Sequence, residues 1–214
     1  MTTTPTVLLL IAAVLSALNW VAVGRGDKRL EYLSKPAATL AFLAVAATLD
    51  VPHDAAWAWR LGALVLCIAG DVFLMLPKDA FVPGLASFAV AQVLFTVSFA
   101  SGETRGPRVI AGLALAVPVA VVLARRFVTA IKSSGHGELV VPVIAYMAVI
   151  SAMAVGAVAS GSAVAIAGAV NFMASDSLIA ETRFVRARAW HGVGIMVTYH
   201  LALAGLVLGL FLNW

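Results

Sequence analysis

Residues 139–158 read LVVPVIAYMAVISAMAVGAV, a run of twenty residues without a single charged side chain. A helix needs about 20 mostly apolar residues to cross the hydrocarbon core of a bilayer. Leu, Val and Ala dominate the run without the alternation of polar residues that marks a barrel strand. The stretch therefore predicts a transmembrane helix.

The rest of the chain has the same character. Of its 214 residues, 63% are hydrophobic and 11% are charged, whereas soluble domains carry about 25% charged residues. The net charge of +4 could suggest nucleic acid, but the basic residues lie in short clusters between apolar runs, as in membrane loops. We expect an integral, multi-pass protein of the cell (inner) membrane, with the lipid bilayer and not nucleic acid as its partner.

Eight apolar segments are candidates for membrane spans. They predict an all-α polytopic bundle in which residues 1–214 form a single integral-membrane domain. The second candidate is short, and only Ser160 and Gly161 separate the sixth from the seventh. The predicted spans are about 5–24, 36–50, 57–76, 81–100, 108–124, 139–158, 162–180 and 192–213.

Lys and Arg predict the orientation. Eleven of the 14 basic residues fall in the loops after the odd-numbered spans, and only Arg60, Arg105 and Arg108 lie on the other side. The positive-inside rule then places both termini on the non-cytoplasmic side, and an even number of spans agrees with the termini sharing a side. The eleven are Arg25, Lys28, Arg29, Lys35, Lys78, Arg125, Arg126, Lys132, Arg183, Arg186 and Arg188.

Two aspartates interrupt the apolar runs. Asp71 lies about five residues before the inner end of the third span, and Asp176 about four before that of the seventh. At helical rise they lie roughly 8 Å and 6 Å from those ends, at nearly the same depth. Acids in hydrocarbon are costly and normally face the bundle interior or a wet cavity. Two that share an apolar site would suit acid–base chemistry, with one carboxyl neutral and one ionised.

Cations accompany the two aspartates. Lys78 and Arg183 each follow an aspartate by seven residues, about two helical turns and hence on the same face, and Lys35 precedes Pro36 at the inner mouth of the second span. We expect these three cations to ring a pocket whose floor holds both carboxylates. The structural alternative is that each aspartate simply caps a loop or pairs with its following cation.

Several polar residues inside the spans are further candidates for substrate binding. Each alone is more often a hydrogen bond between helices than part of a site. Cys67 is expected to be a packed side chain. No sequence motif for a metal, a nucleotide or a serine hydrolase occurs, so we expect no metal and no cofactor. The polar candidates are Gln92, Tyr146, Asn171, Ser175 and Tyr199.

An ordered set of short motifs covers nearly the whole chain. It consists of Lys35-Pro36, Gly70-Asp71-(x)2-Leu74-Met75, Phe81-(x)2-Gly84-(x)3-Phe88, Tyr146-(x)6-Met153, Gly168-Ala169-(x)2-Phe172-(x)2-Ser175-Asp176-(x)3-Ala180-(x)3-Phe184 and Tyr199-(x)2-Ala202. Together these motifs resemble the YhhN-like, or lysoplasmalogenase, family of polytopic membrane proteins.

The resemblance implies hydrolysis of the vinyl ether bond of a lysoplasmalogen, a lysophospholipid, to a fatty aldehyde and a glycerophospho-alcohol. It implies that Asp71 and Asp176 are catalytic, and Lys35, Arg183 and Lys78 would then hold the substrate phosphate. The family pattern usually has a His and a Tyr in the fourth span and a Gln in the eighth, where this chain has Gln92, Phe95 and Leu203. These departures leave the true lipid substrate open.

A second class of function uses the same residues. A proton-coupled transporter or a lipid-binding membrane protein without hydrolase activity could use the two aspartates as a proton relay. Spans three and seven occupy equivalent places in two four-span halves, as in transporters built from parallel repeats. A cavity open only to the inner leaflet would favour the enzyme, and alternating aqueous mouths would favour transport. The oligomeric state is not indicated by the sequence.

Overall fold

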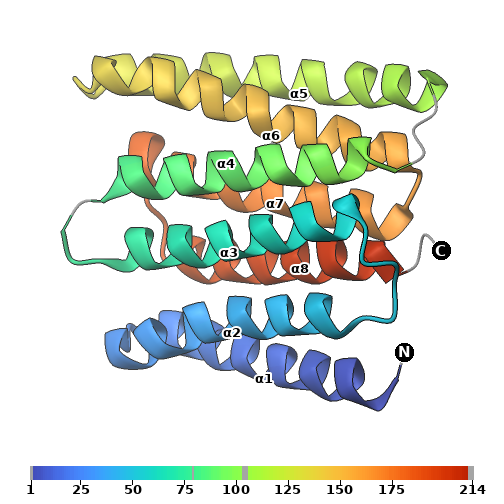
Figure 1. Ribbon diagram of the computed structural model, residues 1–214. Coiled ribbons are helices and arrows are strands. Elements are labelled where there is room, and N and C mark those ends of the chain that lie inside the picture. The colour runs from blue at the N-terminus through green and yellow to red at the C-terminus, as the bar shows by residue number, and fades with distance from the viewer. Residues whose placement is uncertain (1, 79, 103–105, 212–214) are drawn as a thin grey trace.

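A computed structural model describes residues 2–78, 80–102 and 106–211 as a bundle of eight long α-helices without strands. Successive helices run in opposite directions, so that the first helix begins and the last helix ends at the same end of the bundle (Figure 1). The helices are α1 (Thr3–Arg25), α2 (Lys28–Thr48), α3 (Ala55–Met75), α4 (Phe81–Ala100), α5 (Gly106–Ser133), α6 (Val140–Ser160), α7 (Ala163–Ala180) and α8 (His191–Phe211).

Two short elements complete the described chain: the 3-10 turn η1 (Gly137–Leu139) before α6, and the π-helical turn η2 (Glu181–Val185) that continues α7. Seven of the described helices are long and apolar enough to cross a membrane. The all-α class is thus confirmed, and the protein is an integral, multi-pass membrane protein. Arg105 and the final residues of the predicted last span lie outside the described residues.

The second helix differs from its prediction, which placed its start at residue 36. α2 begins eight residues earlier because Asp27 caps it. The Asp27 carboxylate accepts hydrogen bonds of 3.1 Å from the backbone N–H groups of Arg29 and Leu30. Pro36 therefore lies inside the helix and not at its start. The early turns carry four charged residues, which is why α2 is not among the seven apolar helices.

The fifth helix also exceeds its prediction, which ended near residue 124, because it continues to Ser133. Arg125 and Arg126 consequently lie on the helix and not in a loop. Arg126 extends to Glu181 of η2, to which its guanidinium donates two hydrogen bonds of 2.9 and 2.7 Å. This bidentate pair ties the end of α5 to the turn that follows α7.

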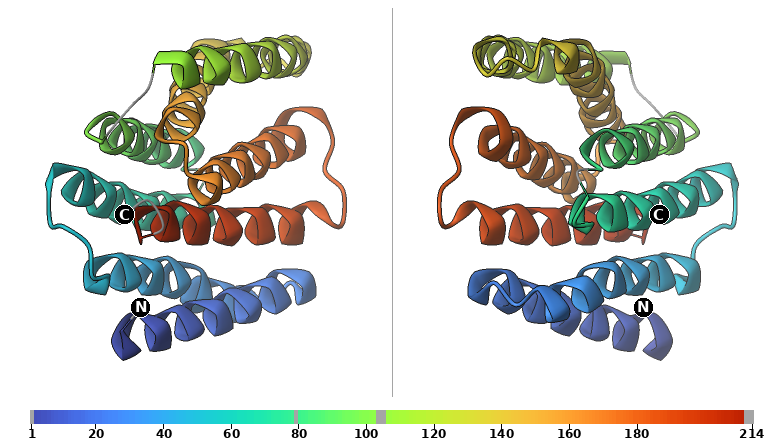
Figure 2. Two further views of the ribbon diagram at one scale, coloured as in Figure 1. Left: turned by 90° about the vertical axis from the view of Figure 1, so that its right-hand side faces the viewer. Right: turned by 90° about the vertical axis from the view of Figure 1, so that its left-hand side faces the viewer.

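The helices are arranged as hairpins around a central group. The pair α1 and α2 lies at one side of the bundle and the pair α5 and α6 at the opposite side, with α3, α4, α7 and α8 between them (Figures 1 and 2). The largest buried side chains include Phe95, Phe172, Leu64 and Met153, which come from these central helices and α6. The two aspartates thus lie on helices of the central group.

Glycines permit the closest helix contact. A Cβ atom on Gly168 of α7 would lie 2.7 Å from the backbone nitrogen of Leu206, and one on Gly205 of α8 would lie 2.6 Å from the Cα of Gly168. Neither position has room for a side chain, so the backbones of α7 and α8 touch directly. This crossing fixes the helix of Asp176 against the helix of Tyr199.

Candidate functional site

Asp71 lies in a fully buried polar cluster built by three helices. Its Oδ2 atom accepts a hydrogen bond of 2.6 Å from Thr39 of α2 and one of 2.9 Å from Tyr199 of α8. Its Oδ1 atom lies 3.5 Å from the ammonium of Lys35 and has no hydrogen-bond partner among the described residues. Two hydroxyl donors and one cation form an environment that suits an ionised carboxylate.

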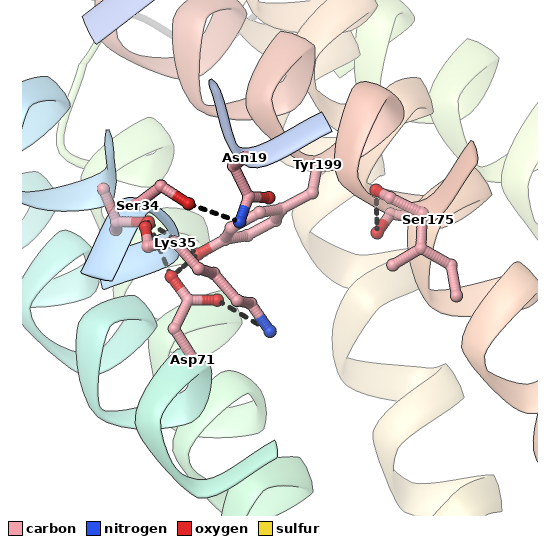
Figure 3. Close-up of polar contacts among 8 residues, drawn as sticks. Asn19, Ser34, Lys35, Asp71, Ser175 and Tyr199 are labelled. Carbon is pink, nitrogen blue, oxygen red and sulfur yellow. Dashed lines mark hydrogen bonds and ion pairs between the residues drawn. The ribbon is translucent and has the colours of Figure 1, made fainter. Parts of the chain in front are cut away.

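Figure 3 shows Asp71, Lys35 and Tyr199 pointing toward one another, with Asn19 and Ser34 beside them. Asn19 of α1 donates to the hydroxyl of Ser34 at 3.1 Å, so the polar cluster extends across four helices. Helical periodicity explains its α2 members, because Lys35 and Thr39 are four residues apart and share one face. The shift of the α2 start places Lys35 inside the bundle, where only 6% of the residue is exposed, and not at the helix mouth.

Asp176 has a different environment. Its carboxylate accepts a hydrogen bond from the hydroxyl of Tyr146 on α6, and the side chain lines a pocket between α4, α5, α6 and α7. We call this the apolar pocket; it contains about 690 Å³ of empty space. Its polar lining residues are Tyr146, Ser151, Asp176 and Ser177, and the others are Leu74, Phe81, Leu85, Phe88, Ala120, Leu123, Phe127, Val143, Met147, Ile150, Met173, Ile179, Ala180 and Phe184.

Cys67 is packed in the core on the same helix as Asp71. It is fully buried on α3, one turn before Asp71, and lies within electrostatic range of both Asp71 and Asp176. Its thiol is also close to the hydroxyl of Tyr199. The prediction of a packed, free cysteine is confirmed.

A second pocket, the basic vestibule, lies beside the apolar pocket and contains about 1060 Å³ of empty space. The three cations predicted to ring a pocket all line it, together with Lys28 and Glu31. Leu74, Phe81 and Ile179 line both pockets, so these side chains form a shared wall. The full lining is Val23, Lys28, Glu31, Lys35, Phe73, Leu74, Leu76, Lys78, Ala80, Phe81, Ile179, Thr182, Arg183, Gly192, Ile195 and Met196.

The cations do not pair as the seven-residue spacing suggested. The cation that Asp71 contacts is Lys35, because α3 ends at Met75 and Lys78 lies beyond it, exposed at the rim of the vestibule. The guanidinium of Arg183 lies 4.2 Å from the centre of the Phe81 ring, over the wall between the two pockets. Neither carboxylate lines the vestibule: Asp176 lines the apolar pocket, and Asp71 is fully buried behind Lys35.

The remaining predicted residues divide into two groups. Gln92 is fully buried on α4, and its amide faces the Tyr146 hydroxyl without reaching hydrogen-bonding geometry. Asn171 and Ser175 instead bond to backbone: Asn171 donates to the Ala167 carbonyl of its own helix at 2.9 Å, and Ser175 to the Ile195 carbonyl of α8 at 3.2 Å. Figure 3 shows Ser175 apart from the Asp71 cluster.

Thr39 and His200 also belong to the site region, although neither is among the predicted substrate-binding residues. Thr39 could have been found from its spacing of four residues from Lys35. His200 is buried next to Tyr199, and its Nδ1 atom accepts a hydrogen bond of 2.9 Å from the indole of Trp20. Its Nε2 atom has no partner among the described residues. No group of three or more His, Cys, Asp or Glu side chains in the described part of the chain could hold a metal ion.

Comparisons with known proteins agree with the resemblance seen in the sequence. The chain is 31% identical to the human (Homo sapiens) lysoplasmalogenase TMEM86B over 66% of its own length and 58% of that protein. It is also 31% identical to the lysoplasmalogenases of Mycobacterium bovis and Mycobacterium tuberculosis, over 81% of its length and 68% of theirs. No solved structure matches significantly.

A family model also matches most of the chain. It covers residues 30–210, from the early part of α2 to the last turn of α8. This range includes both aspartates, the three cations and the hydroxyl groups that contact the carboxylates. The chain belongs to the YhhN family.

Proposed function

We propose that this protein hydrolyses the vinyl ether bond of lysoplasmalogen-type lysophospholipids. The observation that carries the proposal is the carboxyl group of Asp176 in an apolar pocket directly beside a basic vestibule, in a chain of the YhhN family. The phosphate of a lysophospholipid fits the vestibule, where Lys35, Lys78 and Arg183 offer positive charge. Its 1-alkenyl chain would enter the apolar pocket, whose lining is mostly hydrocarbon.

Vinyl ether hydrolysis starts with a proton transfer to carbon. The π electrons of the alkene form a C–H bond at the carbon distal to oxygen, and the proton comes from a neutral carboxylic acid. The oxocarbenium ion that results is attacked by water, which gives its proton back to the carboxylate. The hemiacetal then loses the glycerol oxygen as an alcohol and becomes the aldehyde. The reaction thus needs one neutral and one ionised carboxyl group, but no redox step.

The contacts of the two aspartates support different roles for them. Asp176 lies among mostly apolar side chains with one hydroxyl donor, Tyr146, and this environment favours the neutral acid. Asp71 faces an ammonium and accepts two hydroxyl hydrogen bonds, and this environment favours the anion. We assign the proton transfer to Asp176. Asp71 is the anion that holds Lys35 in the wall of the vestibule.

The test is an aldehyde assay on purified protein in nanodiscs. Wild-type protein should release fatty aldehyde from a lysoplasmalogen but not from the saturated ether analogue, because only the vinyl ether accepts a proton on carbon. Asp176→Asn and Asp71→Asn should each lose at least about 100-fold in kcat, a typical loss for removal of a catalytic acid. Asp50→Asn is the matched control, because Asp50 is exposed at the opposite end of α2. A wild-type protein that releases no aldehyde contradicts the proposal.

A further inference from the structure

A third cavity, which we call the α5–α7 groove, runs along α6 between α5 and α7 and contains about 990 Å³ of empty space. α5 packs mainly on α6 and not along α7, which leaves the space between them open. The groove is lined by Gly112, Leu115, Ala116, Val119, Leu123, Ala154, Val158, Ile166, Ala169, Val170, Met173, Ala174 and Ser177.

The groove continues the apolar pocket. Leu123, Met173 and Ser177 line both cavities, and Ser177 follows Asp176 directly in the chain. One end of the groove therefore lies next to the carboxyl group that we assign as the acid. From there the groove leads toward the α6–α7 turn, away from the basic vestibule, because its lining extends to Val158 and Ile166 near that turn.

The chemistry of the lining points to a hydrocarbon occupant. None of the lining residues is charged, and Ser177 is the one that carries a polar side chain. The Ser177 hydroxyl donates to the Met173 carbonyl of its own helix at 2.7 Å, so it is already satisfied. A polar ligand would find no hydrogen-bond partner there, whereas an alkyl chain would lose nothing on entry.

The length of the groove matches one lipid chain. Its lining on α7 runs from Ile166 to Ser177, a separation of eleven residues or about 16 Å at helical rise. The hydrocarbon core of a bilayer is about 30 Å thick, so one leaflet is about 15 Å deep. The groove can therefore hold most of a single chain of a membrane lipid in extended form.

We propose that the α5–α7 groove binds the alkyl chain of the substrate and sets the longest chain that the protein accepts. The inference rests on the proposed function, since it takes the reacting bond to lie beside Asp176. Two positions of the lining mark two levels of the groove. Ala116 of α5 marks the level closer to Asp176, because it lies one turn nearer to Tyr146 than Gly112, which packs on Val155. Val158 of α6 marks the far end.

The test inserts a phenyl ring at each level. Ala116→Phe should block the groove close to Asp176, and Val158→Phe should block it near the α6–α7 turn. Ala114→Phe is the matched control, because Ala114 is an exposed residue of the same helix that does not line the groove. The substrates are lysoplasmalogens with octenyl, dodecenyl and hexadecenyl chains, and the readout is the rate of aldehyde release at subsaturating substrate.

Val158→Phe should lower the rate for the hexadecenyl lipid by about tenfold or more while the octenyl lipid reacts at the wild-type rate, because only the long chain meets the ring. Ala116→Phe should reduce the rates for both the dodecenyl and the hexadecenyl lipid, and Ala114→Phe should change none. Octenyl turnover shows that a variant is folded, and if Ala116→Phe does not fold, Val158→Phe alone tests the groove. Equal loss for all chain lengths, or no loss in either variant, contradicts the inference.

A second readout separates this inference from the proposed function. Saturated 1-O-alkyl lysophospholipids are not hydrolysed, but they should stabilise the wild-type protein in nanodiscs against heat by an amount that grows with chain length. In both groove variants the stabilisation should stop increasing with chain length, and in Ala116→Phe it should stop at a shorter chain than in Val158→Phe. If the wild type releases no aldehyde yet shows this pattern, the groove is correct and the hydrolase proposal is wrong. A groove covered by a second copy of the chain would show no dependence on chain length, which would overturn the inference.

Discussion

The buried pair of Lys35 and Asp71 leads to a quantitative prediction about stability. Only 8% of the Lys35 side chain and 1% of the Asp71 side chain are exposed, and their charged atoms are 3.5 Å apart. Lys35→Met leaves the carboxylate of Asp71 buried without its cation. Loss of one partner of a buried ion pair costs about 3–5 kcal/mol. At about 2–4 °C per kcal/mol for a chain of this size, Tm should fall by roughly 6–20 °C.

The assay is thermal unfolding in nanodiscs, followed by tryptophan fluorescence. Lys28→Met is the matched control, because Lys28 also lies on α2 and pairs with a glutamate, but 68% of its side chain is exposed. An exposed pair contributes about 0–1 kcal/mol, so this variant should change Tm by at most about 4 °C.

The double variant Lys35→Met/Asp71→Asn removes both charges and should recover most of the lost stability. No unpaired charge remains in it, and the amide oxygen of the introduced asparagine can still accept from Thr39 and Tyr199. The reasoning is refuted if Lys35→Met shifts Tm no more than Lys28→Met does. It is also refuted if the double variant loses the sum of the two single losses, since the charges would then be independent.

Three further predictions concern the site and the helix crossing. Tyr146→Phe removes the hydroxyl that donates to Asp176 and should lower kcat about tenfold or more. It should lower Tm less than Lys35→Met does, because Asp176 is only partly buried; unchanged kcat would exclude a role for that hydrogen bond. Arg183→Gln removes a cation from the vestibule and should raise KM several-fold at constant kcat, so a selective loss of kcat would contradict phosphate binding there. Gly168→Val should abolish a stable fold by separating α7 from α8, whereas Gly137→Ala, with open space around it, should be neutral. The measurement is the size-exclusion profile, and a Gly168→Val variant with a normal profile would disprove the tight crossing.

The sequence anticipated some features of the site for clear reasons. A carboxylate in an apolar run is costly, so Asp71 and Asp176 stood out without any structure. The clustering of Lys35, Lys78 and Arg183 around one vestibule was also anticipated, because all three follow or precede apolar runs at the same end of the bundle. The sequence did not anticipate which side chains contact the two carboxylates. Thr39, Tyr146 and Tyr199 come from other helices, at sequence distances of 30 to 128 residues from the aspartates.

The local chain geometry explains the remaining differences. Lys35 was assigned to a helix mouth because it precedes a proline, yet the Asp27 cap starts α2 earlier and carries Lys35 into the core. Arg126 was assigned to a loop because it is charged, yet α5 continues through it to Ser133, and its guanidinium pairs with Glu181 of η2. The Asp27 cap is a contact outside the apolar run, and hydropathy does not contain that contact.

The sequence by itself determined that this chain is a helical bundle in a bilayer, because apolar runs of membrane length are stable in hydrocarbon and not in water. It also determined which carboxylates lie within the apolar spans. Only the tertiary structure decided that Asp71 faces a cation while Asp176 faces an apolar pocket that opens into the α5–α7 groove. The physical reason is that the environment of a side chain depends on which helices pack against its own, and that choice is made by small residues such as Gly168 and Gly205 at the crossings.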